Sequence, residues 1–281
     1  MAEEREYDVV VIGAGSTGEN VADRVVQGGL SAVVVEAELV GGDCSYWACM
    51  PSKALLRPGS ALAAAKRVAG ARQAVTGRLD AAAVLERRDS FTSHWDDSGQ
   101  VGWLEGAHIE LVRGHGRLAG ERRVAVDTPG DSVVLSARHA VAAATGSHPA
   151  VPPIAGLAET RPWTTRDATS AKEVPPRLVV LGGGVAGCEL AQAYTTLGSR
   201  VTLLEMAERL LPTHEPFAGD LLGESMRDAG TDVRTGVTVT AAERHPGGRV
   251  TVHLGGGGSV DADEMLVAAG RRPRTGDLGL E

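Results

Sequence analysis

The sequence predicts an α/β protein with two Rossmann-like units, and three observations support this prediction. A glycine-rich motif of the form G-x-G-x-x-G follows a buried apolar run at residue 13 and again at residue 182. In both copies a helix-forming run comes next, and then a second apolar run that ends on a glutamate. The interval from the first glycine to the glutamate is the same, from 13 to 36 and from 182 to 205. Strand, glycine turn, helix and strand in this order form the βαβ unit of a parallel sheet.

The composition is that of a globular protein of about two domains. The 281 residues are 43% hydrophobic and 23% charged, but only 3% aromatic, so the core depends on Val, Leu and Ala. The net charge of −8 argues against nucleic acid or an anionic membrane as a partner. The chain shows no apolar run of membrane-spanning length, and its acidic start lacks the basic region of a signal peptide. Three cysteines make no disulfide framework, so we expect a reducing compartment, the cytoplasm.

The first glycine motif has the parts of a dinucleotide site. Gly13 makes the tight turn, Gly15 lets a pyrophosphate approach the backbone, and Gly18 allows the helix to pack closely on the strand. The N-terminus of the helix faces the phosphates. Glu36, at the end of the second strand, is placed to bind ribose hydroxyls.

The second motif repeats these parts with Gly182, Gly184 and Gly187. Glu205 stands at the end of the second strand, where a carboxylate favours NAD because it repels the 2′-phosphate of NADP. Arg209 lies near enough to weaken this preference. Two copies with matching spacing predict two dinucleotide sites.

The segment 41–53, GGDCSYWACMPSK, contains two of the three cysteines, Cys44 and Cys49. Residues five apart do not face each other on a regular helix, so we expect Cys44 in a turn or distorted first turn and Cys49 at the opening of a helix. Pro51 is tolerated in such a first turn. The helix N-terminus and Lys53, one turn further on, both favour a thiolate at Cys49. The alternatives are two buried apolar cysteines or half of a zinc site, but zinc wants four ligands and none lies nearby, so no metal is predicted.

Apolar runs between turn signals predict the remaining elements. Helices are expected over 54–68 and 79–104, and strands over 109–112, 124–127, 132–135, 140–144, 250–254, 259–263 and 264–269. Hairpin turns are expected at 128–131 and at the four glycines 255–258. The proline-rich segment 149–153 reads as a linker, which divides the chain into predicted domains 1–150 and 151–281.

Two dinucleotide motifs around a C-x₄-C-x-P-S-K segment closely resemble the class I pyridine nucleotide–disulfide oxidoreductases. This family includes dihydrolipoamide dehydrogenase, glutathione reductase and mercuric reductase. The resemblance covers essentially the whole chain, although Asp43 stands where the family usually has Thr. It implies a glutathione reductase-like fold, with FAD in the first domain and NAD, less readily NADP, in the second. The residues implied at FAD are Gly13, Gly15, Ser16, Gly18, Glu36, Gly41, Gly42, Asp43, Cys44, Lys53, Gly116, Ala144, Thr145 and Gly146. Those implied at the nicotinamide cofactor are Gly182, Gly184, Val185, Gly187, Glu205, Val237 and Gly270.

The resemblance also implies roles in a redox-active centre. Cys49 matches the thiol that contacts the flavin and gives a charge-transfer complex, and Cys44 matches the thiol that exchanges with a disulfide substrate. Lys53 matches the lysine near flavin N5, and Glu189 matches its partner, although Glu189 also suits a helix N-terminus on charge alone. Val185 stands where some relatives carry a tyrosine gate. The implied activity is that of a dihydrolipoamide dehydrogenase-like, FAD-dependent NAD(P)H:disulfide oxidoreductase acting on a small-molecule or protein disulfide.

Family members continue into a C-terminal interface domain whose His-Pro…Glu motif supplies an acid–base histidine to the partner subunit. His148-Pro149 and His245-Pro246 match only superficially, because no Glu follows at a usable distance. We therefore expect two nucleotide-binding domains without the dimerisation domain, and a homodimer for the full-length form. Two alternatives stay open: a flavoenzyme with another acceptor, such as mercuric ion or a quinone, and a nucleotide-binding remnant without full activity.

Overall fold

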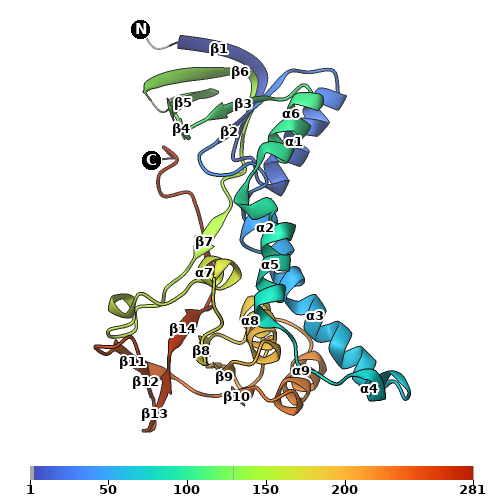
Figure 1. Cartoon of the computed structure of the whole chain (residues 1–281). Coiled ribbons are helices and arrows are strands. Elements are labelled where there is room, and N and C mark those ends of the chain that lie inside the picture. The colour runs from blue at the N-terminus through green and yellow to red at the C-terminus, as the bar shows by residue number, and fades with distance from the viewer. Residues whose placement is uncertain (1–2, 129, 281) are drawn as a thin grey trace. The chain divides into compact units, whose positions relative to one another are not determined.

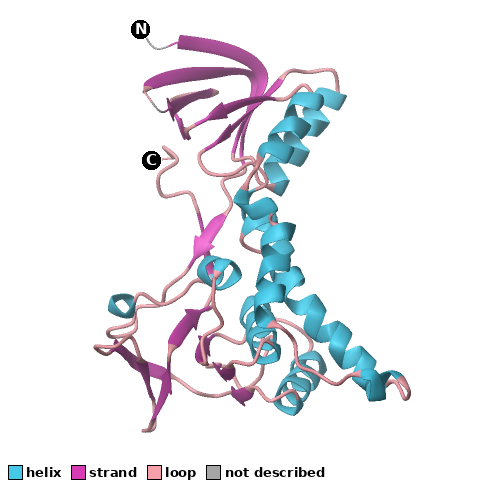
Figure 2. Ribbon diagram, viewed as in Figure 1, coloured by secondary structure: helices cyan, strands magenta, loops and turns pink. Residues whose placement is uncertain are grey.

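The computed structural model describes residues 3–128 and 130–280, which fold into two compact units (Figures 1 and 2). Each unit is assembled from separate segments of the chain. Unit 1 comprises Met1–Tyr46, Thr92–His148 and Arg272–Glu281, and unit 2 comprises Trp47–Phe91 and Pro149–Arg271. The sequence suggested one boundary near residue 150, whereas the contacts also group residues 47–91 with the second half. The assignment of one cofactor to each predicted domain stays a prediction.

Unit 1 contains a six-stranded sheet in the order β3-β2-β1-β6-β5-β4 (Figure 1). The strands are β1 (Glu3–Ile12), β2 (Ala32–Glu36), β3 (Glu110–Arg113), β4 (His115–Leu118), β5 (Arg123–Thr128) and β6 (Asp131–Ala143). The pairs β1–β2, β1–β6 and β2–β3 are parallel, while β4, β5 and β6 pair antiparallel. The helices of this unit are α1 (Ser16–Gln27), α2 (Gly42–Tyr46), η1 (Ser93–Trp95) and α6 (Ser98–Gly106).

The sheet of unit 1 is buried on both faces because β1 is apolar at consecutive positions. Val10 and Ile12 enter one core cluster, and Val9 and Val11 enter the other, as the two-residue period of a strand requires. A near-continuous apolar run is typical of such a doubly covered parallel strand. This burial holds the carboxyl ends of β1 and β2 in place, where the first glycine motif begins.

Unit 2 contains a parallel four-stranded sheet, β10-β9-β8-β14, and a three-stranded antiparallel sheet, β11-β12-β13. The strands are β8 (Arg177–Leu181), β9 (Arg200–Leu204), β10 (Asp232–Arg234), β11 (Val239–Arg244), β12 (Val250–Leu254), β13 (Ser259–Ala262) and β14 (Glu264–Val267). Its helices are α3 (Cys49–Arg67), α4 (Ala71–Ala74), α5 (Ala81–Phe91), η2 (Ala158–Thr160), α7 (Thr165–Ser170), α8 (Val185–Thr196) and α9 (Pro216–Asp228). Two short strands, β7 (Ser147–Pro149) and β15 (Arg271–Pro273), pair with each other.

Apolar packing explains why α3 and α5 belong to unit 2. Leu55 of α3 and Leu85 of α5 share a core cluster with Ala193 of α8 and Leu197 just beyond it. At Gly59 the helices α3 and α8 approach so closely that a Cβ would lie 2.7 Å from the Thr196 hydroxyl. The segment between the two glycine motifs is thus packed against the helix of the second motif.

Two predicted elements differ from the structure. The helical region expected over 79–104 is divided, because left-handed backbone at Ser93, His94 and Trp95 separates α5 from α6. The strands expected at 132–135 and 140–144 are one strand, β6, which pairs with β1 along its length across one irregularity. The hairpin at the four glycines 255–258 is confirmed by the antiparallel pairing of β12 with β13. The turn predicted at 128–131 includes Pro129, which lies outside the described residues, while its neighbours Thr128 and Asp131 pair antiparallel.

None of the helices in the described part of the chain combines the length and the apolar character that crossing a membrane requires.

Candidate nucleotide sites and redox segment

The first glycine loop follows β1 at the carboxyl edge of the unit 1 sheet. The Gly13 N–H donates to Val35 O of β2 at 2.8 Å, and Gly15 forms the N-cap of α1. A Cβ at Gly18 would lie 1.8 Å from Gly13 O, so only glycine lets α1 pack this closely. At Gly15 the nearest atom to an added Cβ is 3.9 Å away, which leaves the loop open at the helix N-terminus.

The carboxylate of Glu36 is held beside this loop. It accepts hydrogen bonds from the N–H groups of Ala14 at 2.8 Å and Glu38 at 2.7 Å. Its location at the end of β2, next to the loop, is where a dinucleotide ribose binds in a Rossmann unit. The predicted partner of the ribose hydroxyls is therefore fixed in orientation by the backbone.

The second glycine loop has the same geometry in unit 2. The Gly182 N–H donates to Leu204 O at 2.9 Å, and a Cβ at Gly187 would lie 1.9 Å from Gly182 O. Glu205 accepts hydrogen bonds from the N–H groups of Gly183 and Ala207, as Glu36 does in unit 1. Gly184 caps α8, and an added Cβ there would meet no atom within 4 Å.

These observations test whether the residues fit dinucleotides. In each loop an added Cβ at Gly15 or Gly184 would meet no atom closer than 3.9 Å, and each loop opens onto a helix N-terminus and carries an oriented carboxylate. Anions bind at such helix ends because the unpaired N–H groups and the helix dipole both favour negative charge. The residues present fit two dinucleotide cofactors.

A third strand, predicted in both units, completes each loop, although Ala268, just after the end of β14, was not predicted at a cofactor. The Ala144 N–H donates to Ile12 O at 2.8 Å, and the Ala268 N–H donates to Leu181 O at the same distance. Ala268 therefore corresponds to Ala144, which had been predicted at the cofactor. The common signal is a small-residue run after a buried strand, Ala144-Thr145-Gly146 in one unit and Ala268-Ala269-Gly270 in the other.

Four further residues were predicted at the cofactors: Val185, Val237, Gly116 and Ser16. Val185 is the first residue of α8 and is 52% exposed, and the Val237 N–H donates to Glu205 O. Gly116 lies in β4, where a Cβ would lie 3.1 Å from a methyl of Val35, so its observed contact is core packing. Ser16 opens α1 and accepts a hydrogen bond at its carbonyl from Asn20.

The segment Gly41–Lys53 begins against the first glycine loop. The Gly41 N–H donates to Ala14 O at 2.8 Å, and a Cβ at Gly42 would lie 2.8 Å from the Cα of Gly15. Both Gly41 and Gly42 have positive φ, 109° and 59°, which other residues rarely adopt. The two glycines thus permit a backbone approach that places Asp43 and Cys44 in the short helix α2.

Two residues that the sequence did not indicate, Asp97 and Arg113, hold the backbone just before Gly41. Asp97 accepts a hydrogen bond from the Val40 N–H at 2.7 Å and pairs with Arg113 at 2.5 Å. Arg113 also donates to Glu38 O at 2.8 Å. No local pattern marks this pair, because it joins residues 16 positions apart in different elements.

Cys49 is the first residue of α3, as predicted, and Pro51 lies in its first turn. Cys44, Cys49 and Cys188 are all thiols; Cys49 is exposed and Cys44 is half-buried. The boundary between the two units falls after Tyr46, between the two cysteines. Cys44 therefore belongs to the unit of the first loop, and Cys49 belongs to the unit of the second.

Lys53 and Glu189 lie together within unit 2. The Lys53 Nζ is 2.5 Å from Glu189 Oε1, and the Ser52 hydroxyl donates to Glu189 Oε2 at 3.1 Å. Lys53 is one turn beyond Cys49 on α3, and Glu189 is in the second turn of α8. The pairing expected from the resemblance is present, and the catalytic roles of the two residues stay predictions.

Cys188 is the buried helix cysteine of the second motif. Its Sγ lies 3.3 Å from Gly183 O. Burial raises the pKa of the Cys188 thiol to about 12, and the nearby carboxylates of Glu205 and Glu189 act in the same direction. Such a thiol is inert at neutral pH. Within the described residues, no group of three or more His, Cys, Asp or Glu side chains is placed to hold a metal ion.

Two Rossmann-like units with matching glycine loops, joined by a C-x₄-C segment, define a protein that binds two dinucleotides. Residues 7–281 match the family described as pyridine nucleotide-disulphide oxidoreductase, and the chain belongs to this family. The predictions of family and α/β fold class are thereby confirmed.

Named relatives include mercuric reductases and dihydrolipoyl dehydrogenases. The chain is 33% identical to mercuric reductase of Staphylococcus aureus, covering 98% of this chain and 50% of that protein. It is 39% identical to dihydrolipoyl dehydrogenase 3 of Pseudomonas aeruginosa, covering 98% of this chain and 60% of that protein. A similar solved structure is that of the HOCl-induced flavoprotein disulfide reductase RclA from Escherichia coli, in its Cu(II) complex. The TM-score is 0.84 at 25% identity, covering 98% of this chain and 58% of that one. The chain thus spans about half to three fifths of the length of these relatives.

Proposed function

We propose that the chain is the nucleotide-binding part of an FAD-dependent NAD(P)H:disulfide oxidoreductase. Electrons pass between the nicotinamide cofactor, FAD and the Cys44–Cys49 pair. The observation that carries the proposal is the occurrence of two glycine loops of the same geometry on either side of a C-x₄-C segment. The two loops would bind the two dinucleotides, and the two thiols would pass electrons to a disulfide substrate.

The unit with Gly13 and Glu36 would hold FAD, and the unit with Gly182 and Glu205 would hold the nicotinamide cofactor. When bound, these two cofactors supply the hydride chemistry. Glu205 disfavours a 2′-phosphate, so NAD is proposed ahead of NADP. The chain's own residues bind and orient the cofactors and hold the positive charge of Lys53 one turn from Cys49.

The two cysteines would perform the sulfur chemistry. Reduction of the Cys44–Cys49 disulfide takes two electrons and two protons and leaves two thiols. The Cys44 thiolate then attacks one sulfur of the substrate disulfide and releases one substrate thiol. The Cys49 thiolate attacks Cys44 of this mixed disulfide, which restores the protein disulfide and releases the second thiol.

The relatives named mercuric reductase support a second candidate, a flavoenzyme that passes its electrons to a metal ion. A quinone reductase-like enzyme and a nucleotide-binding remnant are the remaining alternatives. For the full-length protein we propose a homodimer in the cytoplasm, in keeping with a chain of only three cysteines that has no disulfide framework.

Flavin binding and a thiol-dependent spectrum test the proposal. The purified chain, mixed with FAD, is expected to retain a yellow flavin after gel filtration. NADH titration is expected to produce long-wavelength charge-transfer absorbance that disappears in Cys49→Ser. Cys44→Ser is expected to keep this band and lose turnover of a small disulfide such as lipoamide. Failure to bind flavin would overturn both enzyme candidates, and turnover of mercuric ion in place of disulfides would favour the second.

A further inference from the structure

The short helix α7 of unit 2 is fixed at its start. The Trp163 N–H donates to Met265 O of β14 at 2.8 Å, which ties the entry of the helix to the sheet. The Thr164 N–H and hydroxyl both donate to the Asp167 carboxylate, at 2.7 and 2.6 Å. This capping arrangement satisfies groups that a helix N-terminus otherwise leaves unpaired.

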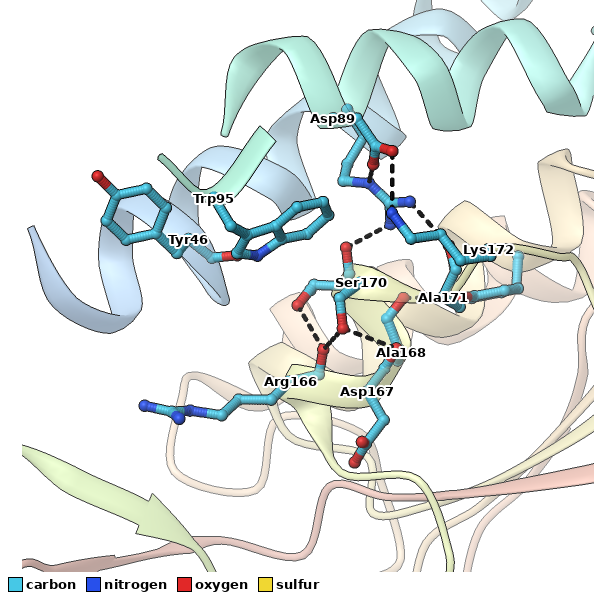
Figure 3. A network of polar contacts seen from close by, with 12 residues as sticks. Tyr46, Asp89, Trp95, Arg166, Asp167, Ala168, Ser170, Ala171 and Lys172 are labelled. Carbon is cyan, nitrogen blue, oxygen red and sulfur yellow. Dashed lines mark hydrogen bonds and ion pairs between the residues drawn. The ribbon is translucent and has the colours of Figure 1, made fainter. Parts of the chain in front are cut away.

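The end of α7 is fixed by a buried arginine of α5. Arg88 is 0% exposed and donates to Thr169 O and, at 2.7 Å, to Ala171 O. Asp89 balances its charge and pairs in turn with Lys172 at 3.0 Å (Figure 3). Terminal carbonyls of a helix lack partners within the helix, and a cation is favoured there. Hydrogen bonds therefore hold both ends of helix α7.

Two side chains of α7 contact Trp47, which lies between the two cysteines in the sequence. The Arg166 side chain points away from the Asp89–Lys172 cluster, and its guanidinium carbon lies 4.1 Å from the centroid of the Trp47 ring (Figure 3). Thr169 is buried, and its hydroxyl is 2.9 Å from Trp47 O and also 2.9 Å from Thr165 O within α7. One contact is with the ring and the other is with the backbone carbonyl, so α7 restrains both parts of Trp47.

Trp47 lies next to the start of α3. Only Ala48 separates it from Cys49, the first residue of that helix. Ala48 is the N-cap and has no side-chain oxygen to cap the helix. The contacts of Trp47 with α7 therefore lie two residues before the start of α3.

We propose that Arg166 and Thr169 are positioning residues for the Cys49 thiol and act through Trp47. The inference deepens the proposed function and rests on it, since it assigns a purpose to the position of a redox thiol. A fixed Trp47 lowers the conformational entropy lost when the disulfide closes, and so favours closure. Neither residue touches the reacting sulfur atoms through the contacts described, so neither is a catalytic residue.

The equilibrium between the cysteine pair and glutathione measures this effect. Two protein thiols and one oxidised glutathione give the Cys44–Cys49 disulfide and two reduced glutathiones, a balanced two-electron exchange. Purified chain is equilibrated in glutathione buffers of graded ratio, quenched with acid and analysed by mass spectrometry. The alkylation rate of Cys49 by iodoacetamide, measured in a Cys44→Ser background, gives a second readout without the disulfide.

Arg166→Ala and Thr169→Val are each expected to lower the equilibrium constant for disulfide formation by about two- to fivefold, the range of one such contact. Each is also expected to change the Cys49 alkylation rate. Arg166→Lys, which keeps a cation over the ring, is expected to restore part of the loss. In a Trp47→Leu background, Arg166→Ala is expected to have no further effect on Cys49, because the ring that Arg166 contacts is gone.

Arg249→Ala is the matched control, since it removes the same group from an exposed turn of unit 2. An unchanged equilibrium constant and alkylation rate in Arg166→Ala would overturn the inference, as would a full effect of Arg166→Ala in the Trp47→Leu background. Arg166 is only half-buried, so Arg166→Ala is expected to fold. If Thr169→Val does not fold, Arg166→Ala alone tests whether α7 positions Cys49. If the wild-type chain forms no Cys44–Cys49 disulfide in any buffer, the proposed function fails, and the alkylation rates still decide whether Arg166 positions Cys49.

Discussion

The Lys53 ammonium lies 2.5 Å from the Glu189 carboxylate, although 136 positions separate the two residues in the chain. Lys53 belongs to the helix that Cys49 opens, and Glu189 belongs to the helix of the second glycine motif. Packing of Leu55 against Ala193 holds these helices together. The ion pair therefore links the redox segment with the second nucleotide loop inside one compact unit.

Glu189→Gln is expected to slow the reduction of bound flavin by NADH by about tenfold or more, because Lys53 loses the charge that orients its ammonium. The Lys53 side chain is 61% exposed, so the free energy of unfolding should change by less than about 1 kcal/mol. Stopped-flow absorbance gives the rate, and urea titration gives the stability. A normal rate in a folded variant would remove Glu189 from the proposed machinery.

Gly184→Ala is expected to fold normally and to weaken NADH binding. Gly184 has φ −74°, which alanine adopts, and an added Cβ meets no protein atom within 4 Å. The methyl group would occupy only the room proposed for the pyrophosphate. Calorimetric titration with NADH, alongside the melting temperature, separates these effects.

Gly187→Ala is the counterpart of that experiment, because its Cβ would lie 1.9 Å from Gly182 O. We expect this variant to lose stability as well as binding. Unchanged NADH affinity in Gly184→Ala would show that the open side of the second loop does not receive the phosphates.

Arg88→Met is expected to destabilise unit 2 by about 2 kcal/mol or more, because it removes a fully buried donor and leaves Asp89 with Lys172 as its ion-pair partner. It also leaves Thr169 O and Ala171 O without this donor. Arg57→Met, an exposed change on α3, should stay within about 0.5 kcal/mol. Urea unfolding of the two variants checks the contrast, and equal effects would contradict a buried clamp at α7.

Asp8 is expected to make stability depend on pH at the acid end. Hydrogen bonds from the N–H and hydroxyl of Ser31, and then from Arg138, lower the pKa of Asp8 from 3.8 to about 2. Because the folded state holds the charged form more strongly, the stabilisation is present above the ordinary pKa and is lost as the pH falls toward 2.

Asp8→Asn should therefore be less stable than the wild type at pH 7, and the difference should narrow steadily below about pH 4. Urea titrations between about pH 2 and 7 measure it. A difference that stays constant over this range would show that the Ser31 contacts do not depend on the Asp8 charge.

The two glycine loops, the β12–β13 hairpin and the start of α3 at Cys49 could be predicted from the amino-acid sequence. These features depend on backbone conformations that short patterns dictate: glycine where a Cβ would meet a carbonyl, and proline in a first helical turn. The matching interval from glycine to glutamate likewise follows from the fixed lengths of strand, turn and helix.

Which segments pack together could not be predicted in this way and is seen in the folded chain. Residues 47–91 join the second half of the chain because Leu55 and Leu85 bury against α8, and no local pattern records this choice. The same is true of Arg88 at the end of α7 and of Arg166 over Trp47. The contacts of Arg88 and Thr169 join residues more than 80 positions apart in the chain. Such contacts arise from apolar burial and charge pairing in three dimensions, and sequence spacing does not reveal them.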